Sequence, residues 1–219
     1  MAIFIITFLL VYGSIHCYMF MKLTHALSPG PALRIITALL MGCMVFFPFL
    51  ERMLIRLGYE PPACIVALIG YCWMGFVFFF FFSAILFDVY HLFIRMCGLL
   101  SRQDLSHLRA SARMAFLVPL VLSLAVSAYG YMEAKSIRTE HLTIKSSKIP
   151  PHAGRIRIVQ ISDVHIGVII GESRLKEMLR GVISADPDIL VSTGDLVDGQ
   201  LDGLGSTKDM FRKIQPRLG

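Results

Sequence analysis

Acidic and imidazole side chains follow two apolar runs in the last third of this 219-residue chain. Asp163 and His165 come directly after the first run, and Asp195 and Asp198 come after the second. Carboxylate oxygens combined with an imidazole nitrogen suit Mn²⁺, Fe or Zn²⁺ better than Ca²⁺. Any one of these residues alone could equally be a turn former or a helix cap, so the chemistry depends on whether the fold brings them together.

The elements around these residues are predicted to be a strand, a helix and a second strand. Residues 155–161 and 189–193 are apolar, β-branched runs typical of strands that are buried on both faces. The residues between them carry apolar side chains at the spacing of one helix face, namely Leu175, Met178, Leu179, Val182 and Ile183. A right-handed parallel crossover of this kind places both acidic turns at the same sheet edge.

Neighbouring parallel strands lie about 4.8 Å apart, which would let Asp163 and Asp195 share one cation. His165 would add an imidazole nitrogen from the same side. Gly194 allows the chain to turn sharply from the second strand, and Gly199 does the same after Asp198. The spacing therefore predicts a metal site with carboxylate and imidazole ligands.

The two blocks ISDVHIG (161–167) and STGDLVDG (192–199) resemble the first two signature blocks of the calcineurin-like metallophosphoesterases. The apolar preface resembles that of the membrane-anchored bacterial members. The resemblance implies a β-sandwich flanked by helices that holds two divalent ions, Mn, Fe or Zn. It also implies that a hydroxide activated by the metals hydrolyses a phosphate ester.

The resemblance further implies a role for each site residue. Asp163 and His165 would hold the first metal, and Asp195 would bridge the two metals. Asp198 would stabilise the loop or a metal ligand instead of binding metal itself. Gly194 would have a supporting role too, by allowing the turn. No catalytic residue beyond the metal ligands is expected.

The later blocks of that family, a Gly-Asn-His block and further histidine loops, do not occur, and no histidine follows His165. The first metal would then have three ligands and the second only one. We therefore expect an N-terminal fragment of a longer protein, with a truncated α/β domain. These 219 residues are expected to be inactive alone.

The remainder of the chain has the composition of a membrane protein. Hydrophobic residues make up 56% of the sequence and charged residues 16%, which is outside the usual range of soluble domains. Four apolar runs are long enough to cross a bilayer or nearly so, at residues 2–21, 35–50, 63–87 and 114–131. Residues 1–133 are therefore predicted to form a four-helix transmembrane bundle, an all-α unit. Residues 134–154 are predicted to be a linker with a short strand at 140–145, and residues 155–219 a partial phosphoesterase domain.

The segments beside these runs are also informative. Residues 22–34 are expected to be a linker, and residues 99–113 an amphipathic stretch along the membrane surface. Asp88, His91 and Arg95 follow the third run at helical spacing, where solvation at the interface explains them better than a proton relay. The five cysteines lie in or beside the apolar runs without CxxC spacing, so no disulfide or zinc framework is predicted.

Lys and Arg near the helix ends favour an orientation with the N-terminus outside, by six residues against four. The C-terminal part would then face outward from a bacterial inner membrane. The formal net charge of +6 is spread along the chain without a basic stripe, so nucleic acid is not an expected partner.

Two functions fit these observations. The first is a membrane-anchored, metal-dependent phosphoesterase whose partners are the lipid bilayer and a phosphate-ester or pyrophosphate substrate, including a lipid-linked or cell-envelope one. The second is a catalytically inactive membrane protein with a vestigial phosphoesterase domain. A transporter or channel is disfavoured because the predicted helices carry no charges in mid-membrane.

Overall fold

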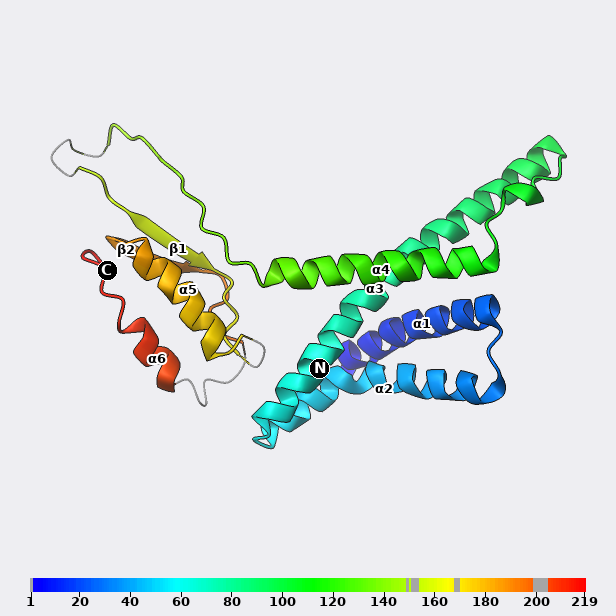
Figure 1. Cartoon of the computed structure of the whole chain (residues 1–219), viewed down its shortest axis with the longest axis horizontal. Coiled ribbons are helices and arrows are strands. Elements are labelled where there is room, and N and C mark those ends of the chain that lie inside the picture. Colours follow the sequence, from blue (N-terminus) through cyan, green and yellow to red (C-terminus); the bar gives the residue numbers. More distant parts are fainter. Residues whose placement is uncertain (1, 149, 151–153, 168–169, 199–204) are drawn as a thin grey trace. The chain divides into compact units, whose positions relative to one another are not determined.

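The computed structural model describes residues 2–148, 150, 154–167, 170–198 and 205–219. The chain forms two compact units, with the boundary between Lys135 and Ser136. The first unit is helical, and the second contains a parallel pair of strands with two helices (Figure 1).

The N-terminal unit contains four α-helices and one 3-10 helix. They are α1 (Ala2–Leu27), α2 (Pro31–Arg56), α3 (Glu60–Ser101), η1 (Ser106–Leu108) and α4 (Ala112–Ala134). By length and composition, four helical segments of this unit are able to cross a membrane. The predicted four-helix membrane region is therefore confirmed as a set of four long apolar helices.

The helix starts explain why these helices extend beyond the apolar runs. Pro31 occupies the first turn of α2. Proline has no amide hydrogen, but an amide at this position makes no hydrogen bond within the helix, so none is lost. The Ser111 side chain caps α4 by accepting a hydrogen bond from the Met114 amide at 3.3 Å. The linker expected at 22–34 is wrong for most of its length, because α1 continues to Leu27 and α2 begins at Pro31.

Helix α3 has 42 residues, which at about 1.5 Å per residue is roughly twice the thickness of a bilayer core. It does not stop at Phe87, and it includes most of the first turn of the amphipathic stretch expected at 99–113. That stretch is not one helix, because α3 ends where Arg102 adopts a left-handed conformation with φ of 53°. Its amide bonds back to the Gly98 carbonyl, which terminates α3.

Three polar contacts tie α1 to α3. The Tyr18 hydroxyl donates to Asp88 Oδ2 at 2.6 Å, and Lys22 forms an ion pair with the same carboxylate. The Trp73 indole donates to His16 Nε2 at 2.8 Å, on a histidine that is buried. Asp88 therefore stabilises the association of helices through protein partners.

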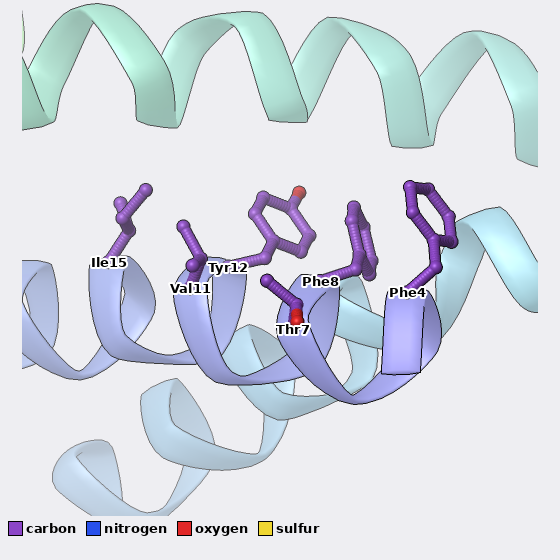
Figure 2. Close-up of a pocket in the computed structure, with 6 residues that line it drawn as sticks. All are labelled: Phe4, Thr7, Phe8, Val11, Tyr12 and Ile15. Carbon is purple, nitrogen blue, oxygen red and sulfur yellow. The ribbon is translucent and has the colours of Figure 1, made fainter. Parts of the chain in front are cut away.

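An apolar hollow of about 320 Å³ lies against one face of α1. Figure 2 shows Phe4, Phe8 and Tyr12 on this face, with their rings directed toward a neighbouring helix. The lining residues are Phe4, Thr7, Phe8, Val11, Tyr12 and Ile15. The lining is mostly apolar, which is consistent with α1 being a candidate membrane span.

The C-terminal unit contains β1 (Ile158–Ser162), α5 (Glu172–Ser184), β2 (Ile189–Thr193) and α6 (Gly205–Phe211). The two strands are parallel neighbours, with Ile158 opposite Ile189 and Ser162 opposite Thr193. This arrangement confirms the predicted strand-helix-strand unit. The second strand has the predicted bounds, and the first begins at Ile158 instead of residue 155.

The core of this unit forms from α5, α6 and the loops after the strands. Leu175 is 0% exposed, and Leu179 and Val164 are also buried. Ile161 joins the cluster, whereas Ile158 is exposed because strand residues of opposite parity point to opposite faces. The expectation that both strand faces are buried is therefore wrong for the described residues.

The structure contradicts two further sequence predictions. Ile183, which the sequence pattern places on the buried face of α5, is exposed, because it lies at the edge of the apolar stripe next to the helix end. Residues 140–145 form no strand: they are irregular, and Leu142 is 86% exposed. An isolated strand has no partner for its backbone groups, and no described strand pairs with this segment.

Candidate metal centre

The acidic loops that follow β1 and β2 remain hydrogen-bonded to each other beyond the strands. The His165 amide donates to the Asp195 carbonyl at 3.1 Å, and the Asp198 amide donates to the Ile166 carbonyl at 2.9 Å. These bonds continue the parallel register past the sheet. They hold the backbones of Asp163, His165, Asp195 and Asp198 side by side at the carboxyl edge of the strands.

Asp163 is the first acidic residue after β1, and its backbone is left-handed, with φ of 50°. Its carboxylate accepts hydrogen bonds from the Ser162 hydroxyl at 2.5 Å and from the Asp195 amide at 3.4 Å. The Ser162 bond is the main cause that lowers the pKa of Asp163, followed by the Asp195 amide. The side chain is therefore held as a carboxylate, which is the form that binds metal.

Gly194 has a positive φ of 71°. A Cβ atom at this position would overlap the Asp163 carboxylate, at 2.8 Å from its Cγ. Glycine is thus required both for the predicted turn and for the close approach of Asp163. Gly167 is similarly close to the other loop, since a Cβ atom there would lie 3.1 Å from that of Asp198. Gly199, the second predicted turn glycine, lies outside the described residues.

His165 is held by Asp198. The distance from its Nδ1 to Asp198 Oδ1 is 2.6 Å, and φ of His165 is 50°. This hydrogen bond raises the pKa of His165, and the charges of Asp198, Asp195 and Asp163 raise it further. Because Asp198 occupies Nδ1, Nε2 is the ring nitrogen that can bind a metal, as in carboxylate–histidine–metal arrangements.

The donor types at this edge fit a divalent ion, but the side chains do not yet converge on one point. Within residues 2–148, 150, 154–167, 170–198 and 205–219, no group of three or more His, Cys, Asp or Glu side chains is arranged to hold a metal. Asp163 contacts the backbone of Asp195, and His165 contacts Asp198. Side-chain rotation would be needed for Asp163, His165 and Asp195 to share a cation, so their role as ligands stays a prediction.

Two residues of this unit were not found by sequence reasoning. The role of Ser162 could have been predicted, because its hydroxyl is next to Asp163 in the first signature block. Nothing in the sequence around Arg157 indicates its role. Its guanidinium donates to the carbonyls of Ala185 and Asp186 at 2.8 and 2.9 Å. This contact fixes the turn between α5 and β2, and so helps to set the register of the strands.

The comparison with known families agrees with this geometry. Residues 156–217 match the model of the calcineurin-like phosphoesterases. Over these residues the C-terminal unit is similar to the calcineurin-like phosphoesterases. Members of this family are hydrolases that act on phosphate esters and normally use divalent metals.

Several curated metallophosphoesterases are similar to the chain. It is 34% identical over 100 residues to an uncharacterized metallophosphoesterase of Aquifex aeolicus, covering 46% of this chain and 38% of that protein. It is 31% identical over 101 residues to a Danio rerio transmembrane protein with metallophosphoesterase domain, covering 46% and 23%. It is 39% identical over 67 residues to the UDP-2,3-diacylglucosamine pyrophosphatase LpxG of Chlamydia trachomatis, covering 31% and 20%.

The chain therefore spans less than half the length of these relatives. They come from a vertebrate as well as from bacteria, so the similarity does not restrict the chain to the bacterial type. No solved structure matches the chain significantly.

Proposed function

We propose that the chain is the membrane-anchored portion of a metal-dependent phosphoesterase, and that the edge after β1 and β2 provides metal ligands. One observation carries this proposal. The two acidic loops are hydrogen-bonded side by side, within the segment that matches the family. Asp163 and His165 would hold one divalent ion, and Asp195 would bridge it to a second.

The chain's own residues prepare this site in three ways. The Ser162 hydroxyl keeps Asp163 ionised, Gly194 leaves room for that carboxylate, and Asp198 directs Nε2 of His165 away from the pair. Bound divalent ions would supply Lewis-acid polarisation of a phosphoryl oxygen and an activated water.

The proposed substrate is a phosphate ester or pyrophosphate carried by a lipid or by the cell envelope. Four candidate membrane spans precede the C-terminal unit in the chain and would anchor it to a bilayer. The name of the C. trachomatis relative describes a pyrophosphatase of a diacylated sugar nucleotide. The excess of Lys and Arg favours placement of the unit on the outer face of a bacterial inner membrane.

Binding of Mn²⁺ to the whole chain in detergent micelles tests the site. Asp163→Ala and Asp195→Ala are each expected to weaken Mn²⁺ binding by at least about tenfold, since even residues that support metal ligands contribute about 10- to 100-fold. Asp209→Asn is the matched control, because Asp209 is an exposed carboxylate on α6 that pairs with Arg212. Equal Mn²⁺ affinity in Asp195→Ala and in the control would contradict the proposed site.

A second candidate is that these 219 residues bind metal but do not catalyse. It is favoured by the predicted ligand count, because Asp163, His165 and Asp195 would hold one metal whereas Asp195 alone would hold the second. Hydrolysis of bis-p-nitrophenyl phosphate with Mn²⁺ distinguishes the two candidates. No turnover is expected from this chain alone, whereas turnover that disappears in Asp195→Ala would establish catalysis.

The proposed orientation is tested separately. A reporter that is active only outside the inner membrane, fused after Gly219, is expected to be active. Activity of a reporter that works only in the cytoplasm would place the C-terminal unit on the inner face.

A further inference from the structure

The segment that follows α3 folds back onto the helix end. The Gln103 amide donates to the Gly98 carbonyl at 3.1 Å, and a Cβ atom at Gly98 would lie only 3.0 Å from the Gln103 carbonyl oxygen. Further down, the Tyr90 hydroxyl donates to the Leu108 carbonyl at 2.6 Å. The returning segment is therefore fixed to α3 at two levels. We call residues 88–113 the basic hairpin, because they contain four arginines, two histidines and two aspartates.

A hollow of about 360 Å³ lies within the basic hairpin. It has two arginines on its wall: Arg95 comes from α3, and Arg109 from the segment after η1. Both side chains are exposed, and among the residues that the structure describes neither guanidinium group has a hydrogen bond or an ion pair, although the charge of Arg109 acts on Asp104. The complete lining is Ile94, Arg95, Gly98, Leu99, Gln103, Asp104, Leu105 and Arg109.

One acidic residue shares this hollow. Asp104 uses its carboxylate to accept a hydrogen bond from the Ser106 amide at 2.8 Å, at the start of η1. With Arg95 and Arg109, it leaves the lining with a formal charge of +1. A hollow with one net positive charge and two guanidinium groups that make no hydrogen bond is complementary to a monoanionic phosphodiester.

The surroundings of the hollow favour a lipid over a soluble anion. Leu100 is 82% exposed, and Leu99 and Phe93 on the same part of α3 are also exposed. These apolar side chains are unfavourable in water but stable in the boundary between headgroups and acyl chains. Apolar side chains stay exposed along α3, a candidate membrane span, as far as Leu100, and this favours a position of its last turns at the headgroup layer.

We propose that this hollow binds the phosphate of an anionic phospholipid headgroup. Arg95 and Arg109 donate to the phosphate oxygens from opposite sides, and Leu99 and Leu105 contact the glycerol and upper acyl region. Arginine suits this role because its planar group offers several donors in fixed geometry. The site lies entirely in the N-terminal unit, so it does not depend on the phosphoesterase proposal.

The test uses the whole chain in neutral detergent micelles, titrated with phosphatidylglycerol or phosphatidylcholine and read by native mass spectrometry. Phosphatidylglycerol is expected to bind at least about tenfold more tightly than phosphatidylcholine. The double variant Arg95→Gln/Arg109→Gln is expected to lose about tenfold or more of that affinity, because each basic residue near an anionic surface contributes roughly 1 kcal/mol.

The matched control is Arg102→Gln/Arg113→Gln, which removes the same charge from the basic hairpin outside the hollow. It is expected to change phosphatidylglycerol affinity by less than about threefold. If the first double variant does not fold, Arg109→Gln alone serves as the second variant, with an expected loss of about fivefold. Circular dichroism checks that the helices are retained.

Three outcomes would overturn the proposal. The first is equal phosphatidylglycerol affinity in the two double variants, which would show that the loss of affinity depends only on the total charge removed. The second is equal affinity of the unmodified chain for both lipids. The third is binding of glycerol 3-phosphate as tightly as phosphatidylglycerol, which would identify a soluble phosphate as the ligand.

Discussion

The two units of this protein use apolar residues in opposite ways. In the C-terminal unit Leu175 is 0% exposed and Leu179 is buried, because water is the surrounding solvent and burial of apolar surface stabilises the fold. In the N-terminal unit Leu86 is 69% exposed, and Leu39 and Phe78 are exposed on their helices too. Lipid chains are as apolar as leucine, so these side chains gain little from contact with one another.

Polar groups show the reverse arrangement. In the N-terminal unit the buried His16 of α1 accepts a hydrogen bond from the half-buried Trp73 of α3. In the C-terminal unit the polar residues gather at the open edge of two strands, where Asp163 and His165 have left-handed backbones. Backbone strain at non-glycine residues is sustained only where the surrounding structure enforces it, and it is common at functional sites. The contrast separates an anchoring unit from one suited to chemistry.

The largest predicted effect concerns the two kinds of leucine. Leu175→Ala is expected to destabilise the C-terminal unit by about 2–5 kcal/mol, through lost burial and the cavity left behind. Leu86→Ala, on the exposed surface of α3, is expected to change stability by less than about 0.5 kcal/mol. Hydrogen exchange of peptides from α5 and from α3 measures the two effects. Similar losses of stability in both variants would contradict the interpretation that lipid surrounds the N-terminal unit and water the C-terminal unit.

A pair of glycines is expected to show the next largest difference. Gly194→Ala places a methyl group against Asp163 at a positive φ, so we expect a cost of about 1–3 kcal/mol in the C-terminal unit. Gly130→Ala lies in α4, where a Cβ atom meets nothing within 4 Å. It is expected to be neutral or to stabilise α4 by up to about 1 kcal/mol. Hydrogen exchange of peptides from β2 measures the effect of Gly194→Ala. Circular dichroism in a denaturing-detergent titration measures the effect of Gly130→Ala.

The hydrogen bond between Trp73 and His16 in the N-terminal unit gives a smaller effect. Trp73→Phe removes the indole N–H that donates to His16, and we expect a loss of about 0.6 kcal/mol, the average for hydrogen bonds between membrane helices, and at most about 1.7 kcal/mol. Unfolding in a denaturing-detergent titration, followed by circular dichroism, tests this. Tyr129→Phe is the control, because Tyr129 is an exposed residue of α4. Equal stability of the two variants would show that the His16 contact contributes nothing.

The smallest effect is a pH response confined to the C-terminal unit. Asp198 raises the pKa of His165 above its ordinary value of 6.5, so the pair stabilises the fold below that value. The contribution is lost as pH rises through the raised pKa. Asp198→Asn is expected to lower the pKa of His165, measured by NMR titration of histidine-labelled, metal-free chain. Assignment comes from the signal absent in His165→Gln, and an unchanged pKa in Asp198→Asn would contradict the pairing.

The same titration predicts the opposite trend for metal. A proton on His165 competes with a cation, so Mn²⁺ affinity is expected to fall as pH falls through the raised pKa. A Mn²⁺ affinity that is constant across this range would argue against His165 as a ligand.

The sequence by itself determined the four apolar helices, the strand-helix-strand order and the two acidic blocks. These features depend on local periodicity and on turn residues, so the information that specifies each of them lies within one short segment of the chain. The bounds of β2 were predicted because its β-branched run lies between Pro187 and Gly194, which both interrupt regular structure. The positions of Asp163 and Asp195 at one edge followed from the parallel crossover.

Only the tertiary structure decided the rest, because the deciding contacts join residues far apart in the chain. Arg157 contacts the turn at Ala185, and Asp163 lies against Gly194, each about thirty residues away. The length of α3 likewise depends on the fold-back that Gly98 permits, which no periodicity reveals. Local pattern specifies which elements form, whereas steric fit between distant segments specifies where they end and which side chains meet.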